Sequence, residues 1–153
     1  MSGLLNVGEM GALALHAMLE VGKKNRKGYK GWISTTEIAE TLEASRHTLH
    51  KVVKRLVYAG LLSSARGPMG GVRLQAEPQE ISLLKIIEAV EGEVNPGGCL
   101  FSRRICSVKS LCQFCGITTD LEVMVREYFA KTTIAELLDR LNGREIVKDP
   151  PAG

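Results

Sequence analysis

The sequence has few aromatic residues and no long apolar run, and both absences limit what the protein can be. Phe, Trp and Tyr make up 5% of the 153 residues, whereas hydrophobic residues make up 44%. The composition therefore excludes a disordered chain and predicts a core of Leu, Ile, Val, Ala and Met. No stretch approaches the roughly 20 apolar residues that a membrane-spanning helix needs.

Other absences concern targeting and catalysis. The first residues, Met1–Leu5, lack the basic segment that opens a signal peptide, so we expect a cytoplasmic protein without membrane contact. Cysteines in that compartment are more often metal ligands or redox thiols than disulfides. We find no nucleophile–base pairing, phosphate-cradling loop or paired carboxylates, which indicates that the protein is not an enzyme.

The net charge is only +3, but the basic residues are unevenly distributed. Residues 22–74 hold eleven Lys and Arg against three Glu, a net charge of +8. Such an asymmetry favours a polyanionic partner for this half of the chain. Five of these basic residues fall within 22–31, where a solvated loop explains them equally well.

Hydrophobic periodicity and helix-capping residues predict a mainly helical chain with one small hairpin. Ser34, Ser45 and Ser82 are each suited to cap a helix, and Ser34 with Glu37 fits a capping box. The pattern predicts helices over 7–21, 37–42, 46–58, 83–90, 121–129 and 134–141, strands over 61–65 and 72–75, and a basic loop over 22–31.

The order helix, short turn, helix and two-stranded hairpin is that of a winged helix-turn-helix. On the second helix of the pair, one face is aliphatic and the opposite face is basic or hydrogen-bonding. The aliphatic residues are Leu49, Val52, Val53 and Leu56, and the polar ones are His47, Lys51, Lys54 and Tyr58. Such a helix suits the major groove of DNA, although an ordinary amphipathic surface helix has the same pattern.

The turn between the strands, residues 66–71, also favours contact with DNA. Its three glycines allow the backbone to approach a phosphate ridge closely. Arg66 precedes this tight turn and is suited to the narrow, negative minor groove. The alternative is a plain turn with a solvated arginine.

Over most of its length the sequence resembles the Rrf-type regulators, the family of IscR and NsrR. The resemblance rests on residues 45–74, Ala17–Val21, Ile81–Gly92 and Thr133–Leu138. It implies a homodimeric winged-helix transcription regulator that binds a pseudo-palindromic operator in double-stranded DNA, often under the control of an iron–sulfur cluster. The implied fold is mainly α with a small β-hairpin wing and a long dimerisation helix.

The resemblance also implies which residues face the operator and which face a second subunit. The operator-facing residues are Ser45, Arg46, His47, Thr48, His50, Lys51, Arg66, Gly67, Pro68 and Gly70. The dimerisation stripe is Leu121, Met124, Val125, Tyr128 and Phe129, which by spacing alone fits a plain core as well. His50 stands where some relatives have an acidic base reader, so the operator sequence stays open.

All four cysteines lie within residues 99–115, in the pattern C-x6-C-x5-C-x2-C formed by Cys99, Cys106, Cys112 and Cys115. Thiolates are soft ligands that suit iron–sulfur clusters and zinc. The resemblance implies that the first three are cluster ligands and that Cys115 replaces a ligating histidine. A set of four thiolates holds a 2Fe-2S cluster, which we favour, or a 4Fe-4S cluster.

Several alternatives stay open at this segment. A redox thiol pair, a structural zinc site and inert cysteines compete with a cluster, although only Cys112 and Cys115 form a zinc-type C-x2-C knuckle. His16 or Glu9 of the partner subunit is an alternative fourth ligand. The corresponding alternative function is a cluster-free, thiol-redox or ligand-responsive winged-helix regulator. A small electron carrier or cluster-using enzyme and a winged-helix adaptor for protein or RNA are further alternatives.

We therefore expect four parts along the chain. Residues 1–92 form the winged helix-turn-helix domain and residues 93–117 the cysteine-rich cluster-binding segment. Residues 118–145 form the dimerisation and C-terminal helices, and residues 146–153 form a flexible tail.

Overall fold

The computed structural model describes residues 7–93 and 114–142, with side chains for all of these except 114–118. Its elements in chain order are α1 (Glu9–Arg26), α2 (Thr35–Thr41), α3 (Arg46–Tyr58), β1 (Leu62–Ala65), β2 (Gly71–Leu74), α4 (Leu83–Glu91), α5 (Phe114–Lys131) and α6 (Ile134–Asn142). The predicted fold class, mainly helical with one hairpin, is confirmed. Within the described ranges no helix is both long and apolar enough to cross a membrane.

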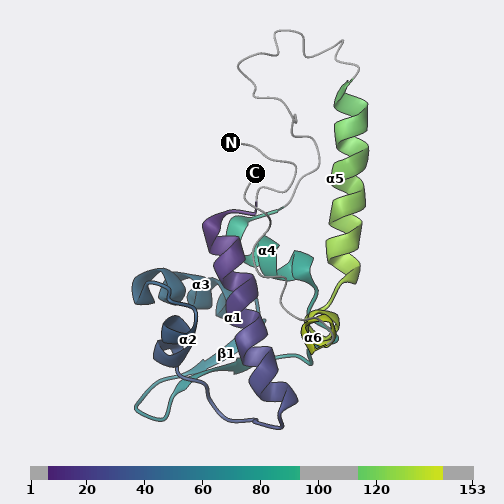
Figure 1. Ribbon diagram of the computed structural model, residues 1–153. Coiled ribbons are helices and arrows are strands. Elements are labelled where there is room, and N and C mark those ends of the chain that lie inside the picture. Colours follow the sequence, from purple (N-terminus) through teal and green to yellow (C-terminus); the bar gives the residue numbers. More distant parts are fainter. Residues whose placement is uncertain (1–6, 94–113, 143–153) are drawn as a thin grey trace, which may run out of the picture.

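Helix α1 runs through the middle of the molecule, with α2, α3 and the hairpin on one side and α6 on the other (Figure 1). Its buried face is built from small and medium side chains, Ala14, Ala17, Met18 and Val21, each at most 1% exposed. Small residues allow neighbouring helices to approach closely. The buried cluster around this face holds no aromatic residue among the described residues, as the composition predicted.

Helix α1 is longer than the sequence indicated, because residues 22–26 continue the helix where a loop was predicted. Gly22, the residue that indicated a helix end, is buried. A Cβ at this position would lie 3.0 Å from Ile134 Cγ2 and 3.2 Å from Leu138 Cδ1. The glycine therefore allows α6 to pack directly on α1.

Two of the three predicted serine caps form. The side chains of Ser34 and Ser82 accept hydrogen bonds from backbone amides two and three residues ahead, at 3.2 and 3.3 Å. Ser45 holds the N-cap position of α3, but its side chain makes no cap hydrogen bond. The predicted capping box is wrong, because the carboxylate of Glu37 pairs with Lys24 at the end of α1.

The wing is the antiparallel pair β1 and β2, with Leu62 opposite Leu74 and Ala65 opposite Gly71. A third segment joins it, since Ile33 and Val72 exchange two backbone hydrogen bonds of 2.9 and 2.8 Å. Gly71 makes this approach possible, with φ at +149° and no room for a Cβ, which would lie 2.1 Å from the Ile33 oxygen. The wing is thereby attached to the residue just before the cap of α2.

Helix α5 stands out from the body as an arm, and α6 turns back toward α1 (Figure 1). An ion pair of 3.0 Å between Arg126 and Glu88 links α5 to α4. Ile134 and Leu138 of α6 are 0% and 4% exposed in the core beside α1. The predicted division of the chain into four parts stays a prediction, and within it α6 completes the core of the N-terminal helices.

We expect Gly71→Ala to lower the free energy of unfolding by about 3–5 kcal/mol, since it adds backbone strain and breaks both bonds to Ile33. Gly67→Ala is the matched control, because φ is +103° there but no atom of the described residues lies within 4 Å of the added Cβ. Strain alone predicts a cost of about 1–2 kcal/mol for the control. Urea unfolding measures both, and equal losses would contradict the assigned role of Gly71.

Candidate nucleic-acid interface

Helix α3 buries its aliphatic face and exposes its polar face, as the periodicity predicted. Leu49, Val52, Val53 and Leu56 are at most 6% exposed, and each fully buried Leu stabilises the fold by about 1.5–3 kcal/mol. On the opposite face His47, His50, Lys51 and Lys54 are exposed, and Tyr58 is 95% exposed. The core contacts therefore fix α3 while its basic face meets solvent.

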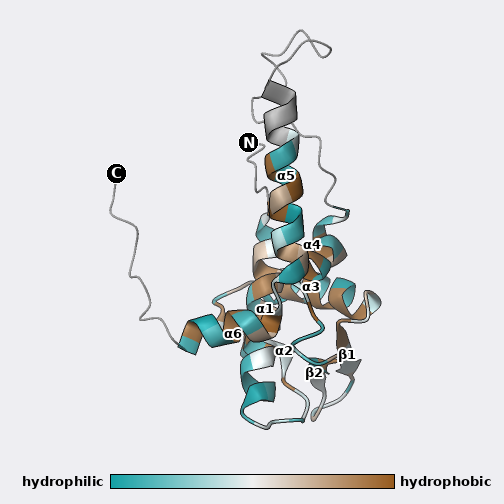
Figure 2. Ribbon diagram, turned by 90° about the vertical axis from the view of Figure 1, so that its right-hand side faces the viewer, coloured by the Kyte–Doolittle hydropathy of each residue, from teal (hydrophilic) through white to brown (hydrophobic). Residues whose placement is uncertain are grey.

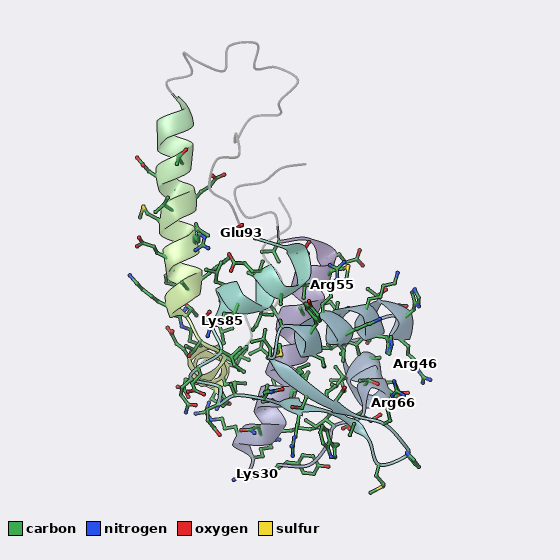
Figure 3. All side chains as sticks on the ribbon, turned by 180° about the vertical axis from the view of Figure 1, so that it is seen from behind. Lys30, Arg46, Arg55, Arg66, Lys85 and Glu93 are labelled. Carbon is green, nitrogen blue, oxygen red and sulfur yellow. The ribbon has the colours of Figure 1, made fainter. Side chains whose placement is uncertain are left out.

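The connection between α2 and α3 sets the direction of α3. Glu43 adopts a positive φ of +50° in this short turn. The amide of Ala44 donates to the carbonyl of Ala39 at 2.9 Å, which closes the turn. Figure 3 shows Arg46, at the start of α3, on the same side of the molecule as Arg66 at the wing.

A groove lies between α3 and the wing. Its lining residues come from α3, the wing turn and the start of α2, and they include His50, Lys54, Arg66, Pro68, Thr35 and Thr36. Gly67 and Gly70 also line it, so the structure brings together half of the predicted operator-facing set. The other half lies at the N-cap and in the first turns of α3, and comprises Ser45, Arg46, His47, Thr48 and Lys51.

The predicted set omitted other residues that line this groove, among them Lys54, Thr35 and Thr36. Lys54 follows His50 by one helical turn on the exposed face of α3, and that spacing was visible in the sequence. Thr35 and Thr36 open α2, and the Ser34 cap that fixes them was the available signal. What the sequence did not indicate is that the Ile33–Val72 pairing carries the wing to the start of α2.

The basic residues of this surface differ from those of segment 22–31 in their partners. Lys23, Lys24 and Arg26 pair with Glu20, Glu37 and Asp139. Among the described residues, none of His47, His50, Lys51, Lys54 and Arg66 takes part in an ion pair. Lys27 and Lys30 have no ion pair among the described residues either, so the paired fraction is higher in segment 22–31 than on α3 and the wing.

Arg46 is the exception on this surface, with an ion pair of 3.0 Å to Glu40. Both side chains are at least two-thirds exposed, at 70% and 67%. Exposed pairs of this kind contribute little to stability. A phosphate or base edge can therefore replace Glu40 at small cost.

The wing turn presents Arg66 on a constrained backbone. The amide of Gly70 donates to the carbonyl of Gly67 at 3.0 Å. A Cβ on Gly70 would lie 2.2 Å from the Ala65 oxygen, so only glycine fits. Arg66, Pro68 and Met69 are exposed around this turn, and Met69 is 88% exposed.

The predicted dimerisation stripe lies on α5 and is incompletely covered by the chain itself. Leu121, Met124 and Tyr128 are 37%, 65% and 51% exposed, while Val125 and Phe129 are half-buried. Figure 2 shows apolar residues along this arm. Its role in dimerisation stays a prediction.

The proposed cluster ligands are described only in part. Cys99, Cys106 and Cys112 lie outside the described residues, and Cys115 falls in the first turn of α5, where only the backbone is described. Glu9 and His16, the alternative ligands, are exposed on α1. Among residues with described side chains, no group of three or more His, Cys, Asp or Glu is placed to hold a metal ion.

Comparison with known proteins places this geometry in a family. Residues 8–140 match the Rrf2 family, described as an iron-dependent transcriptional regulator. The chain is 36% identical over 92 residues to the HTH-type transcriptional regulator CymR of Bacillus subtilis, covering 60% of this chain and 64% of CymR. This match thus spans less than two thirds of CymR.

The chain is also 30% identical over 128 residues to the HTH-type transcriptional regulator IscR of Vibrio atlanticus, and the match covers 84% of this chain and 72% of IscR.

Solved structures of transcriptional regulators have the same fold as this chain. The structure of B. subtilis CymR, titled the global cysteine regulator, matches with a TM-score of 0.72 at 29% identity, over 89% of this chain and 98% of that chain. A putative transcriptional regulator from Listeria innocua matches with a TM-score of 0.77 at 25% identity, over 100% and 99%. The chain belongs to the Rrf2 family of winged-helix transcriptional regulators, a family of regulators and not of enzymes.

Proposed function

We propose that the protein is a homodimeric transcription regulator that binds operator DNA through α3 and the wing, under the control of an iron–sulfur cluster. The observation that carries this proposal is the set of basic side chains on α3 and the wing, Lys51, Lys54 and Arg66, that have no ion pair among the described residues. Counter-ions released from DNA phosphates by such residues drive association, so binding of this kind weakens steeply with salt.

Within the proposed complex, each part of the surface has a separate task. The first turns of α3 carry His47, His50 and Lys51, whose imidazole and ammonium groups hydrogen-bond to base edges in the major groove. Lys54 and the hydroxyls of Thr35 and Thr36 suit phosphate contacts that fix the register. Arg66 suits the narrow minor groove, where the negative potential is strongest.

Dimerisation through α5 would supply the symmetry of the operator. The exposed apolar residues of the stripe are a surface that a second copy of the chain covers in an isologous contact. Two recognition helices are then separated by about one turn of DNA, roughly 34 Å. This separation predicts a pseudo-palindromic operator.

The donor set fits an iron–sulfur cluster. Four thiols occur within residues 99–115, and soft thiolates are the ligands such clusters require. Cys115 lies in the first turn of an 18-residue helix, and helix N-termini favour anionic groups. Cys99, Cys106, Cys112 and Cys115 would hold the group, and when bound it supplies metal–thiolate bonds that respond to redox state or small ligands.

The chain's own residues would convert this chemistry into a change in DNA affinity. Segment 93–117 begins just after α4 and ends within the first residues of α5, so its two ends are attached to the body and to the proposed dimer helix. A change in the ligands bound by the segment's thiols would shift the relative position of the α3 and wing surfaces of the two subunits. The result is a shift in the population that fits the operator.

A second candidate function has support of its own. CymR, one of the relatives found, is titled a cysteine regulator, and Staphylococcus aureus CymR has a structure titled as an oxidized form, 29% identical to this chain. A cluster-free regulator that responds to thiol redox state or to a ligand therefore fits the same fold. Iron and sulfide analysis separates the two candidates.

We expect Arg66→Ala to weaken operator binding by about 1–3 kcal/mol and to reduce the salt slope by about one, because one groove contact is lost. The duplex is one selected from a random-sequence pool with the wild-type protein. Arg26→Ala is the matched control, since this exposed arginine pairs with Asp139 away from the groove. If both variants bind alike, the wing is not the contact.

We expect Cys106→Ser to remove the brown colour and the acid-labile sulfide of protein purified without oxygen, because a serine hydroxyl does not replace a thiolate ligand. Helix content, measured by circular dichroism, should stay close to that of the wild type. Colourless wild-type protein without iron would exclude the cluster and favour the thiol-redox or ligand-responsive candidate.

We expect Met124→Glu to convert a dimer into a monomer in sedimentation experiments, because a charge is placed in an apolar contact. Ala130→Glu adds the same charge to α5 away from the stripe, and its position is also exposed. The control should remain dimeric. A monomeric wild type would contradict the proposed interface.

A further inference from the structure

The C-terminal end of α4 is held by two helices that are distant in sequence. The last carbonyls of a helix have no partner within the helix. The carbonyl of Val90 is one of these, and a guanidinium N–H of Arg55, on α3, donates a hydrogen bond to it. Positive charge at this position also complements the negative end of the α4 dipole. Gly92, with φ at +91°, then ends the helix.

The next residue holds α1. Glu91 Oε1 accepts a hydrogen bond of 2.7 Å from the amide of Gly11, in the first turn of α1. The N-cap of α1 is Gly8, which has no side chain to cap the helix, so the carboxylate from α4 takes that role. A Cβ on Gly8 or Gly11 would lie 2.6 or 3.0 Å from Glu91 Oε1, so both glycines leave room for the carboxylate.

Val90 and Glu91, which are adjacent at the end of α4, therefore bind α3 and the start of α1. The cysteine-rich segment 93–117 begins two residues after Glu91. The aliphatic contacts that hold α3 against the core are non-directional. Hydrogen bonds depend steeply on distance and angle, so Arg55 and Glu91 respond to small displacements of the α4 end.

Arg55 is well placed for this role and poorly placed for contact with DNA. It lies toward the C-terminal end of α3, in the last turn. Figure 3 shows it beside the end of α4, apart from Arg46 and Arg66. Its guanidinium is engaged with the Val90 carbonyl, so its positive charge serves the junction between helices.

We propose that Arg55 and Glu91 are positioning residues that transmit the state of the cysteine-rich segment to the recognition helix. This inference rests on the proposed function and names its internal coupling. A shift of the α4 end changes the hold on α3 through Arg55 and on α1 through Glu91. The operator affinity then differs between the cluster-loaded and cluster-free protein.

The test compares wild type, Arg55→Gln, Arg55→Lys and Lys85→Gln. Each is measured with the duplex selected by the wild type, in the cluster-loaded and the cluster-free form. Lys85→Gln is the matched control, because Lys85 is an exposed cation on α4 whose ammonium group donates to the Glu80 carbonyl at 3.3 Å and has no ion pair among the described residues. Thermal unfolding confirms that each variant is folded.

We expect Arg55→Gln to reduce the affinity ratio between the two forms by about tenfold, within the range found for residues that couple sites. Arg55→Lys, which keeps a donor and a charge, should retain much of the ratio, and Lys85→Gln all of it. Amide hydrogen exchange of the cluster-free protein gives a second readout, because Arg55→Gln should speed exchange in α3, and Glu91→Ala should speed exchange at Gly11.

Two failures are distinguishable in this experiment. If the wild type binds DNA equally in both forms, the proposed cluster control fails, and the coupling fails with it. If the wild type responds and Arg55→Gln keeps the full ratio with unchanged exchange in α3, the coupling through Arg55 is wrong and the proposed function stands.

Discussion

Burial of the aliphatic face of α1 is the constraint on which the other parts depend. The hairpin strand β2 and the helices α3, α4 and α6 all pack against this helix, around Ala14, Ala17 and Met18. Small side chains and Gly22 allow these neighbours to come close. Because α3 is held by its aliphatic face, its basic face is presented to solvent in a fixed orientation. The orientation of the proposed DNA-binding surface is therefore a consequence of core packing.

Whether a basic residue is available to bind a polyanion depends on whether it already pairs with a carboxylate. Residues 22–74 carry a large positive excess, yet the structure compensates much of segment 22–31 with acidic residues, one of them Asp139 on α6. Among the described residues, Lys27 and Lys30 also have no ion pair, and the larger uncompensated group is that of α3 and the wing. A sequence-level charge count does not separate these groups, since the separation depends on contacts between residues far apart in the chain.

The sequence predicted most elements well because their signals are local. The faces of α3, the caps at Ser34 and Ser82 and the wing turn follow from periodicity and turn chemistry. The misses have a common cause in tertiary contacts. In the sequence alone, Gly22 indicates a helix end, whereas in the structure it lies inside α1 and packs against Ile134 and Leu138. Thr35 and Thr36 line the groove because Ile33, just before them, pairs with the wing.

The central claim is that two chains bind duplex DNA through α3 and the wing. Measuring the DNA affinity and the number of bound chains over a range of salt concentrations tests it most directly. We predict two chains per selected duplex and a logarithm of the affinity that falls linearly with the logarithm of salt concentration, as counter-ion release requires. Binding that does not change with salt, or the absence of binding to any duplex from the pool, would contradict it.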